Sequence, residues 1–128
     1  MPDANHIRSV LERYPQLITS GDHEAIVAMY HEDATIEDPV GAAPLKGRAA
    51  ISEFYKASAG TVAMKITGPV RVAGSEAAAP LLVLIGPEGP ARQALEVIDV
   101  MSFDEKGLIT SMRAFWGPDS MRPATPED

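Results

Sequence analysis

The 128-residue sequence contains no cysteine, so it offers neither a disulfide framework nor a thiolate nucleophile. It also lacks an apolar run of about 20 residues, which is the length that spans a bilayer. Its first six residues, Met-Pro-Asp-Ala-Asn-His, do not have the basic and then apolar pattern of a signal peptide. We therefore expect a soluble, cytoplasmic protein with no membrane partner.

Basic residues are few and dispersed. The 11 Lys and Arg face 18 Asp and Glu, which gives a net charge of −7, and they are scattered singly along the chain. Nucleic-acid binding needs a basic stripe that neutralises phosphates, so we expect no nucleic-acid partner.

Metal and cofactor motifs are also missing from the sequence. His6, His23 and His31 are not spaced as metal ligands, and there is no HExxH motif, glycine-rich phosphate loop or G-x-S-x-G elbow. The sequence predicts no metal and no cofactor, and three solvated surface histidines.

The length fits a single domain over residues 1–128 with one sizeable core. Within it, three segments carry the apolar spacing of amphipathic helices. The residues on these helical stripes are Ile7, Val10, Leu11, Tyr14, Leu17 and Ile18, then Ala25, Ile26, Met29 and Tyr30, then Ala50, Ile51, Phe54, Tyr55 and Ser58. Pro15 removes a helical hydrogen bond, so we expect a kink there or an irregular first part of that helix.

The second half of the chain is rich in apolar and β-branched residues divided by turn sequences. Besides a short strand over 34–38, we expect strands within residues 62–72, 77–85, 91–103 and 108–117, with hairpin turns at 73–76, 86–90 and 104–107. The three prolines of residues 118–128 predict a loose tail. Helices followed by a meander predict an α+β fold, with three N-terminal helices packed on a strongly curved, mainly antiparallel mixed sheet that encloses an apolar pocket.

One acidic residue lies in the middle of an expected strand. In residues 93–103, Asp99 shares a strand face with the apolar residues Leu95, Val97, Met101 and Phe103. A carboxyl buried there keeps its proton and becomes a hydrogen-bond donor for negative charge on a ligand oxygen. Alternatively, Asp99 marks an edge, a strand end or an interface, or bonds a backbone amide.

Two further polar residues have both a structural and a chemical interpretation. Asp38 ends a strand directly before Pro39, where it is either a turn residue or a base at the lip of a cavity. Tyr14 lies on the buried stripe of the first helix, either as a core aromatic residue or as a second hydrogen-bond donor.

Taken together, Tyr14, Glu37-Asp38-Pro39 and Val97-Ile-Asp-Val-Met101 resemble the ketosteroid isomerase (3-oxo-Δ5-steroid isomerase) family of the nuclear-transport-factor-two-like cone folds. The likeness runs from about residue 7 to residue 117. It implies that Asp38 is the base and that Tyr14 and Asp99 hold the 3-oxo oxygen, a donor pairing known from that family rather than deduced from this sequence.

The resemblance also implies supporting residues. Tyr30 and Tyr55 match a hydrogen-bonded tyrosine network behind Tyr14 in one branch of the family, although each also fits an ordinary core position. The residues implied to contact the steroid, each equally compatible with a plain core role, are Phe54, Val83, Leu95, Val97, Met112, Ala114 and Trp116. The turn at 86–90 departs from the family in length and composition.

Other functions stay open at this level. The same fold serves dehydratases, epoxide hydrolases and polyketide cyclases, and a non-catalytic steroid-binding protein or dimerisation module is a further alternative. A dehydratase of this fold requires a histidine in the cavity, and none of the three histidines lies on an apolar stripe. Alternation also turns Arg113 away from Met112 and Ala114, which disfavours the Asp-Arg-Asp arrangement of an epoxide hydrolase. We further expect a homodimer through the outer sheet face, which alternation predicts to carry Ile98, Val100, Ile109 and Phe115.

Overall fold

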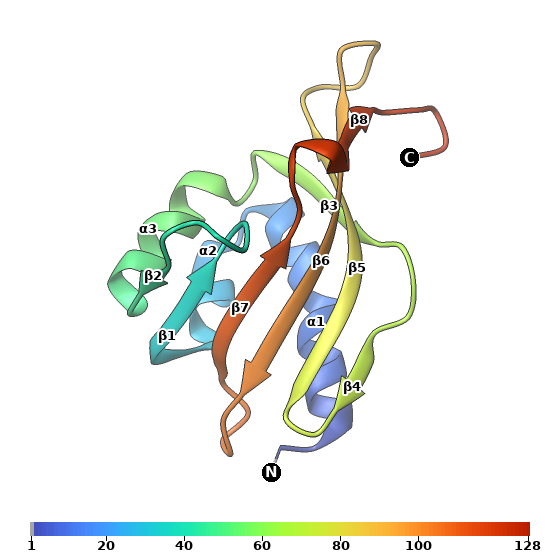
Figure 1. Ribbon diagram of the computed structural model, residues 1–128. Helices are drawn as coiled ribbons and strands as arrows, with labels where there is room; N and C mark the ends of the chain where they lie inside the picture. Colours follow the sequence, from blue (N-terminus) through green and yellow to red (C-terminus); the bar gives the residue numbers. More distant parts are fainter. Residues whose placement is uncertain (1) are drawn as a thin grey trace.

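The computed structural model describes residues 2–128 and has one layer of helices on a curved sheet (Figure 1). The helices are α1 (Ala4–Ser20), α2 (His23–Ala28) and α3 (Arg48–Ser58), followed near the C-terminus by a 3-10 turn, η1 (Pro118–Ser120). The strands are β1 (Tyr30–Glu37), β2 (Leu45–Lys46), β3 (Val62–Ile66), β4 (Arg71–Ala73), β5 (Glu76–Ile85), β6 (Gln93–Phe103), β7 (Ile109–Phe115) and β8 (Met121–Pro123).

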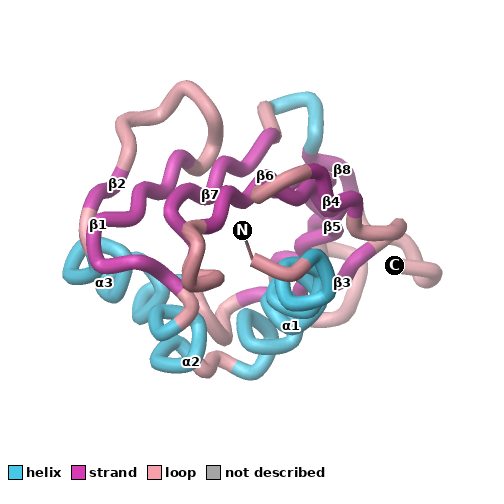
Figure 2. The backbone as a smooth tube through the Cα atoms, turned by 90° about the horizontal axis from the view of Figure 1, so that it is seen from below, coloured by secondary structure: helices cyan, strands magenta, loops and turns pink. Residues whose placement is uncertain are grey.

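The sheet is mixed and does not close into a barrel. Its order is β2-β1-β7-β6-β5-β3, with β4 also paired to β5 and β8 also paired to β6. Only the β1–β7 pair is parallel among the strand pairs of the described residues. Figure 2 shows α1, α2 and α3 together on one side of this sheet, which confirms the α+β arrangement.

Helix α1 forms where its caps and apolar stripe predict. Asp3 accepts a hydrogen bond from the Asn5 N–H at 3.0 Å, and Gly21 ends the helix with φ 81°, a left-handed conformation that suits glycine. The helix continues through Pro15, so its first part is not irregular. The stripe that includes Tyr14 is buried against the sheet, which fixes the side of α1 from which the tyrosine side chain projects.

Several expected boundaries were wrong. Tyr30, expected at the end of the second helix, begins β1 and pairs with Ile109. The expected strand over residues 62–72 is divided into β3 and β4 at the intervening Gly68-Pro69, since proline cannot donate to a strand ladder. Both halves pair with β5, so the sheet remains continuous there.

Within the C-terminal residues 118–128, expected to be loose, residues 118–123 form η1 and β8. Met121 pairs with Leu95, and Arg122 binds both Asp128 (2.7 Å) and Glu96 (3.3 Å). Pro123 fits because β8 pairs with β6 alone, and an edge strand tolerates a residue without an N–H. The tail thus extends the sheet beside the first part of β6.

A bulge in β7 reverses the expected faces at its start. Ser102 pairs with Ser111 and Phe103 pairs with Ile109, so Thr110 is an extra residue opposite β6. Ile109 therefore turns inward and is fully buried, and the prediction that it lies on the outer face was wrong. Ile98 (49% exposed) and Phe115 (41% exposed) do lie outward as expected.

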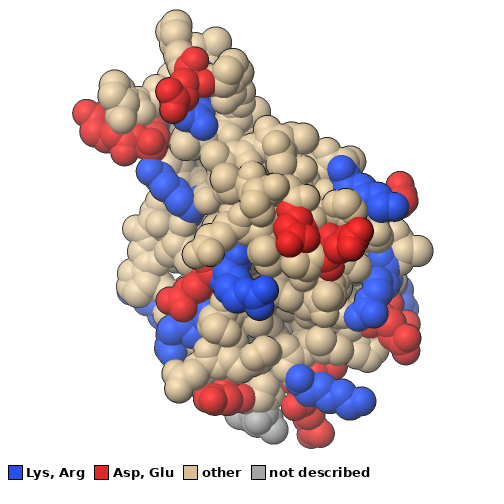
Figure 3. Space-filling model, turned by 180° about the vertical axis from the view of Figure 1, so that it is seen from behind, with Lys and Arg blue, Asp and Glu red and all other residues tan. Residues whose placement is uncertain are grey.

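The described residues include no helix that is both long and apolar enough to cross a membrane. The face opposite that of Figure 1 carries Lys and Arg interspersed with Asp and Glu, without a continuous basic stripe among the residues drawn (Figure 3).

Candidate active site

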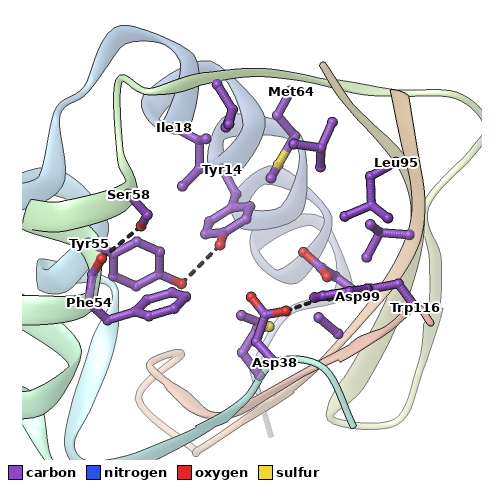
Figure 4. Close-up of a pocket in the computed structure, with 15 residues that line it drawn as sticks. Tyr14, Ile18, Asp38, Phe54, Tyr55, Ser58, Met64, Leu95, Asp99 and Trp116 are labelled. Atoms are coloured by element: carbon purple, nitrogen blue, oxygen red, sulfur yellow. Dashed lines mark hydrogen bonds between the residues drawn. The ribbon is translucent and has the colours of Figure 1, made fainter. Parts of the chain in front are cut away.

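A cavity of about 160 Å³ lies between the helices and the inner face of the sheet. Its lining residues, mostly apolar, come from α1, α3, four strands and the chain just after β1 and β7: Tyr14, Ile18, Asp38, Phe54, Tyr55, Ser58, Val62, Met64, Val83, Leu95, Val97, Asp99, Met112, Ala114 and Trp116. Figure 4 shows that the Tyr14 hydroxyl and the carboxyl groups of Asp38 and Asp99 all point into this space.

Among the Asp, Glu, Lys, Arg and His residues that the structure describes, Asp99 alone is buried, with 3% of its surface exposed. It faces inward from the middle of β6, and its strand neighbours Ala79 and Ala114 are small, which leaves space over its carboxyl. Burial, followed by the nearby charge of Asp38, raises the pKa of Asp99 to about 8. At neutral pH its carboxyl group therefore keeps its proton and can donate a hydrogen bond.

Tyr14 belongs to a chain of three buried tyrosines. Its hydroxyl lies 2.9 Å from the Tyr55 hydroxyl, which in turn lies 2.6 Å from the Tyr30 hydroxyl. Burial is the first cause that raises the pKa of each of the three phenols well above its ordinary value. All three therefore stay neutral, and the chain leaves the Tyr14 hydroxyl able to donate into the cavity.

Asp38 directly follows the last residue of β1, the strand beside the edge strand β2, and its side chain lines the cavity. Its Oδ1 accepts a 2.7 Å hydrogen bond from the Trp116 indole N–H. Burial raises the pKa of Asp38, and the Trp116 hydrogen bond opposes that shift. The group is therefore a stronger base than an exposed Asp while Oδ2 stays available, since no other side-chain hydrogen bond to Asp38 is found within residues 2–128.

The structure brings together the residues that the sequence singled out. Tyr14, Asp38, Tyr55 and Asp99 line the cavity, and Tyr30 lies one hydrogen bond behind Tyr55. The residues predicted to contact a steroid also line it, namely Phe54, Val83, Leu95, Val97, Met112, Ala114 and Trp116. Their functions remain predictions, but their shared location is a property of the fold.

Sequence reasoning missed four lining residues, Ile18, Ser58, Val62 and Met64. The helical period placed Ile18 and Ser58 on the stripes of Tyr14 and Tyr55, but it did not show that they reach the cavity. Val62 and Met64 face inward from β3 by strand alternation.

Outside the cavity, ion pairs join Arg113 to Glu37, Arg122 to Glu96 and Asp128, and Lys56 to Glu53. Arg113 points to the outer face, where its Nε binds Glu37 Oε1 at 3.0 Å. Residues 2–128 contain no group of three or more His, Cys, Asp or Glu placed to hold a metal ion.

A curved sheet with three helices on one face, around a mostly apolar cavity that Tyr14, Asp38 and Asp99 line, is the architecture of a cone-fold domain. The chain belongs to the family described as the SnoaL-like domain, whose model matches residues 11–112. It is 44% identical to a Steroid Delta-isomerase of Nocardioides simplex over 115 residues, which cover 90% of this chain and 93% of that protein.

Two other similar proteins carry a different activity in their names. Epoxide hydrolase LasB of Streptomyces lasalocidi is 31% identical across this whole chain, which spans 49% of that protein. The solved structure of the epoxide hydrolase/cyclase-like enzyme SalBIII, described with a role in pyran ring formation in polyether salinomycin, matches with a TM-score of 0.86 and 31% identity. That match covers 97% of this chain and all of the SalBIII chain.

Proposed function

We propose that this protein is a steroid Delta-isomerase that converts 3-oxo-Δ5-steroids into conjugated 3-oxo-Δ4-steroids without a cofactor. The observation that carries the proposal is that Tyr14, Asp38 and Asp99 face one apolar cavity, in a chain 44% identical to a Steroid Delta-isomerase. Two neutral donors and one carboxylate are the groups that proton transfer next to a carbonyl requires.

In the proposed reaction, the steroid's 3-oxo oxygen lies between the Tyr14 hydroxyl and the protonated carboxyl of Asp99. Asp38 removes a proton from carbon 4, and the electron pair moves through the carbonyl to give a dienolate. Asp38 then returns the proton to carbon 6, so the double bond moves into conjugation and no atoms are gained or lost.

Neutral donors suit this chemistry because they stabilise charge on the enolate oxygen without placing a fixed charge in an apolar cavity. The raised pKa of Asp99, caused first by its burial, keeps the second donor protonated at the pH where Asp38 is ionised. The different surroundings of the two carboxyls thus support different roles.

The direct test is to add 5-androstene-3,17-dione to the protein and follow the ultraviolet absorbance of the conjugated enone. We expect a rise that is retained after dialysis against EDTA. Folded protein that produces no rise above the buffer rate would exclude the isomerase proposal.

The base is tested by Asp38→Asn, which keeps the size of the side chain and its acceptor for Trp116. Loss of a general base lowers turnover by about 10²- to 10⁴-fold. The variant should still bind the phenolic steroid equilenin, because the donor pair is intact. Turnover at the wild-type rate would show that another group removes the proton.

An epoxide hydrolase or cyclase is the second candidate, favoured by the likeness to LasB and SalBIII. The position of Arg113 argues against it, since this strand arginine faces away from the cavity and binds Glu37. Turnover of an epoxide substrate in the absence of isomerase activity would reverse this preference.

We also propose a homodimer, with the outer face around Ile98, Val100 and Phe115 covered by a second copy. Ile98 and Phe115 are large apolar side chains that are 49% and 41% exposed and adjacent in register. Burial of such a pair is favourable. Sedimentation velocity at micromolar concentration should give a dimer, and a monomer would contradict this assembly.

A further inference from the structure

An ion pair lies directly behind Asp38 on the outer face of the sheet. Glu37 is the last residue of β1, and strand alternation turns its side chain away from the cavity. Arg113 is its register partner on β7 and donates from Nε to Glu37 Oε1 at 3.0 Å. In the chain, Arg113 lies between Met112 and Ala114, and both of these neighbours line the cavity.

Backbone hydrogen bonds hold the segment that follows Asp38, next to this ion pair. The Arg113 hydrogen bond is the first cause that lowers the pKa of Glu37. Val40 N–H donates to the Ala114 carbonyl at 2.9 Å, and Ala42 N–H donates to the Pro39 carbonyl at 3.0 Å. The segment after Asp38 is thus bound to β7 by a backbone hydrogen bond, and the residue before Asp38 is bound to β7 by the Glu37–Arg113 ion pair.

Arg113 is itself held in place. Its guanidinium carbon lies 5.2 Å from the centre of the Phe115 ring, a cation–π distance. Asp38, by contrast, receives one side-chain hydrogen bond, from Trp116, within residues 2–128. The direction in which the Asp38 carboxylate points therefore depends on the backbone around it.

We propose that Glu37 and Arg113 are positioning residues for Asp38: they fix the end of β1 so that the carboxylate stays within proton-transfer reach of the substrate. This inference rests on the proposed function. An exposed ion pair adds little to stability, whereas a small displacement of a reacting group costs a large factor in rate. The pair should therefore affect turnover more than folding.

The test variant is Arg113→Met, which keeps a long side chain over Phe115 and removes the guanidinium. We expect kcat for 5-androstene-3,17-dione to fall about tenfold, while KM and equilenin affinity stay within about twofold of wild type. Arg113→Lys, which retains a charge able to reach Glu37, should recover most of the rate. Adding Arg113→Met to Glu37→Ala should cause little further loss, because both changes break the same contact.

The matched control is Lys56→Met. Lys56 also forms an exposed ion pair, with Glu53 at 3.8 Å, and follows a cavity residue, Tyr55, in the chain. It makes no contact with the segment around Asp38 among the hydrogen bonds and ion pairs of the described residues. Its kcat should equal that of wild type, which separates loss of a surface charge from loss of positioning.

Three outcomes would overturn the positioning role. They are a wild-type kcat in Arg113→Met, a parallel loss of kcat and equilenin affinity that indicates general disruption, or a loss of kcat that appears only when sedimentation shows a change of assembly. A wild-type protein without isomerase activity would instead refute the proposed function, and the positioning role would fall with it. An active wild type with an unaffected Arg113→Met refutes the positioning role alone.

Discussion

Replacement of Asp99 by Asn should change how the stability of the protein depends on pH. The substitution keeps the shape of the side chain and removes its titration. In the folded chain the pKa of Asp99 is raised to about 8, first by burial and then by the charge of Asp38, against an ordinary value of 3.8. In the unfolded chain the carboxyl returns to water and to its ordinary pKa.

The direction in which the free energy of unfolding changes with pH depends on whether the folded or the unfolded chain holds the Asp99 proton. Between about pH 4 and pH 8 the folded protein keeps the Asp99 proton and the unfolded chain has lost it, so the free energy of unfolding falls as pH rises through this window. The stability linked to this group is complete below about pH 4 and lost above about pH 8. The Asp99→Asn variant has no such dependence, because its amide does not titrate.

The expected change in the free energy of unfolding is large for a single residue. Each pH unit within the window changes the free energy of unfolding by up to about 1.4 kcal/mol. From pH 4 to pH 7 wild type should therefore lose about 4 kcal/mol relative to Asp99→Asn, as an upper bound, since relaxation around a buried charge reduces such costs. The substitution should be close to neutral at pH 4 and stabilising at pH 7.

Urea unfolding of both proteins at pH 4, 5, 6, 7 and 8, at one protein concentration, measures this difference directly. Other titrating groups contribute equally to the two proteins and cancel. A difference that stays within about 1 kcal/mol across the range would refute the argument that burial holds the proton on Asp99. The rate gives a second readout: the alkaline decline of kcat/KM near pH 8 in wild type should be absent in Asp99→Asn.

The remaining predictions concern groups around the donors and the base. Tyr55→Phe removes the hydroxyl that links Tyr14 to Tyr30, so kcat should fall several-fold with little change in fold, and an unchanged kcat would show that Tyr14 needs no support. Trp116→Phe removes the hydrogen bond that lowers the pKa of Asp38. The acid limb of kcat/KM, which reports ionisation of Asp38 in the free protein, should therefore move to higher pH, and a limb that stays in place or moves lower would contradict the assigned base.

Strand alternation correctly predicted that Asp99 lies on the apolar face of its strand. Along β6, alternation alone separates buried Leu95, Val97 and Asp99 from exposed Glu96 and Ile98, and the structure keeps this pattern. The strand is paired with β5 in unbroken register from Glu76 to Ile85, so no irregularity disturbs the count. A face assigned from sequence is reliable where the strand has no bulge.

The same rule failed on β7 because an inserted residue changes the count. Thr110 is extra relative to β6, so Ile109 lies on the inner face although it is an odd number of residues from Met112. Nothing in the sequence around Ile109 distinguishes a bulge from a regular strand. The consequence is local, since Met112 and Ala114 lie beyond the bulge and face the cavity as expected.

Position along the chain also says little about which segments meet. Tyr14, Asp38 and Asp99 are separated by 24 and 61 residues, and each could be buried without sharing a cavity. They meet because α1 packs on the inner face of the sheet against β3, β4 and β5, and because β1 joins β7 in parallel, which brings the end of β1 beside Ala114 and Trp116. Neither contact has a local sequence signal. The parallel pairing therefore has a chemical consequence: it places the residue after β1 at the cavity that holds the two donors, and the Glu37–Arg113 pair lies at the end of β1, where that pairing stops.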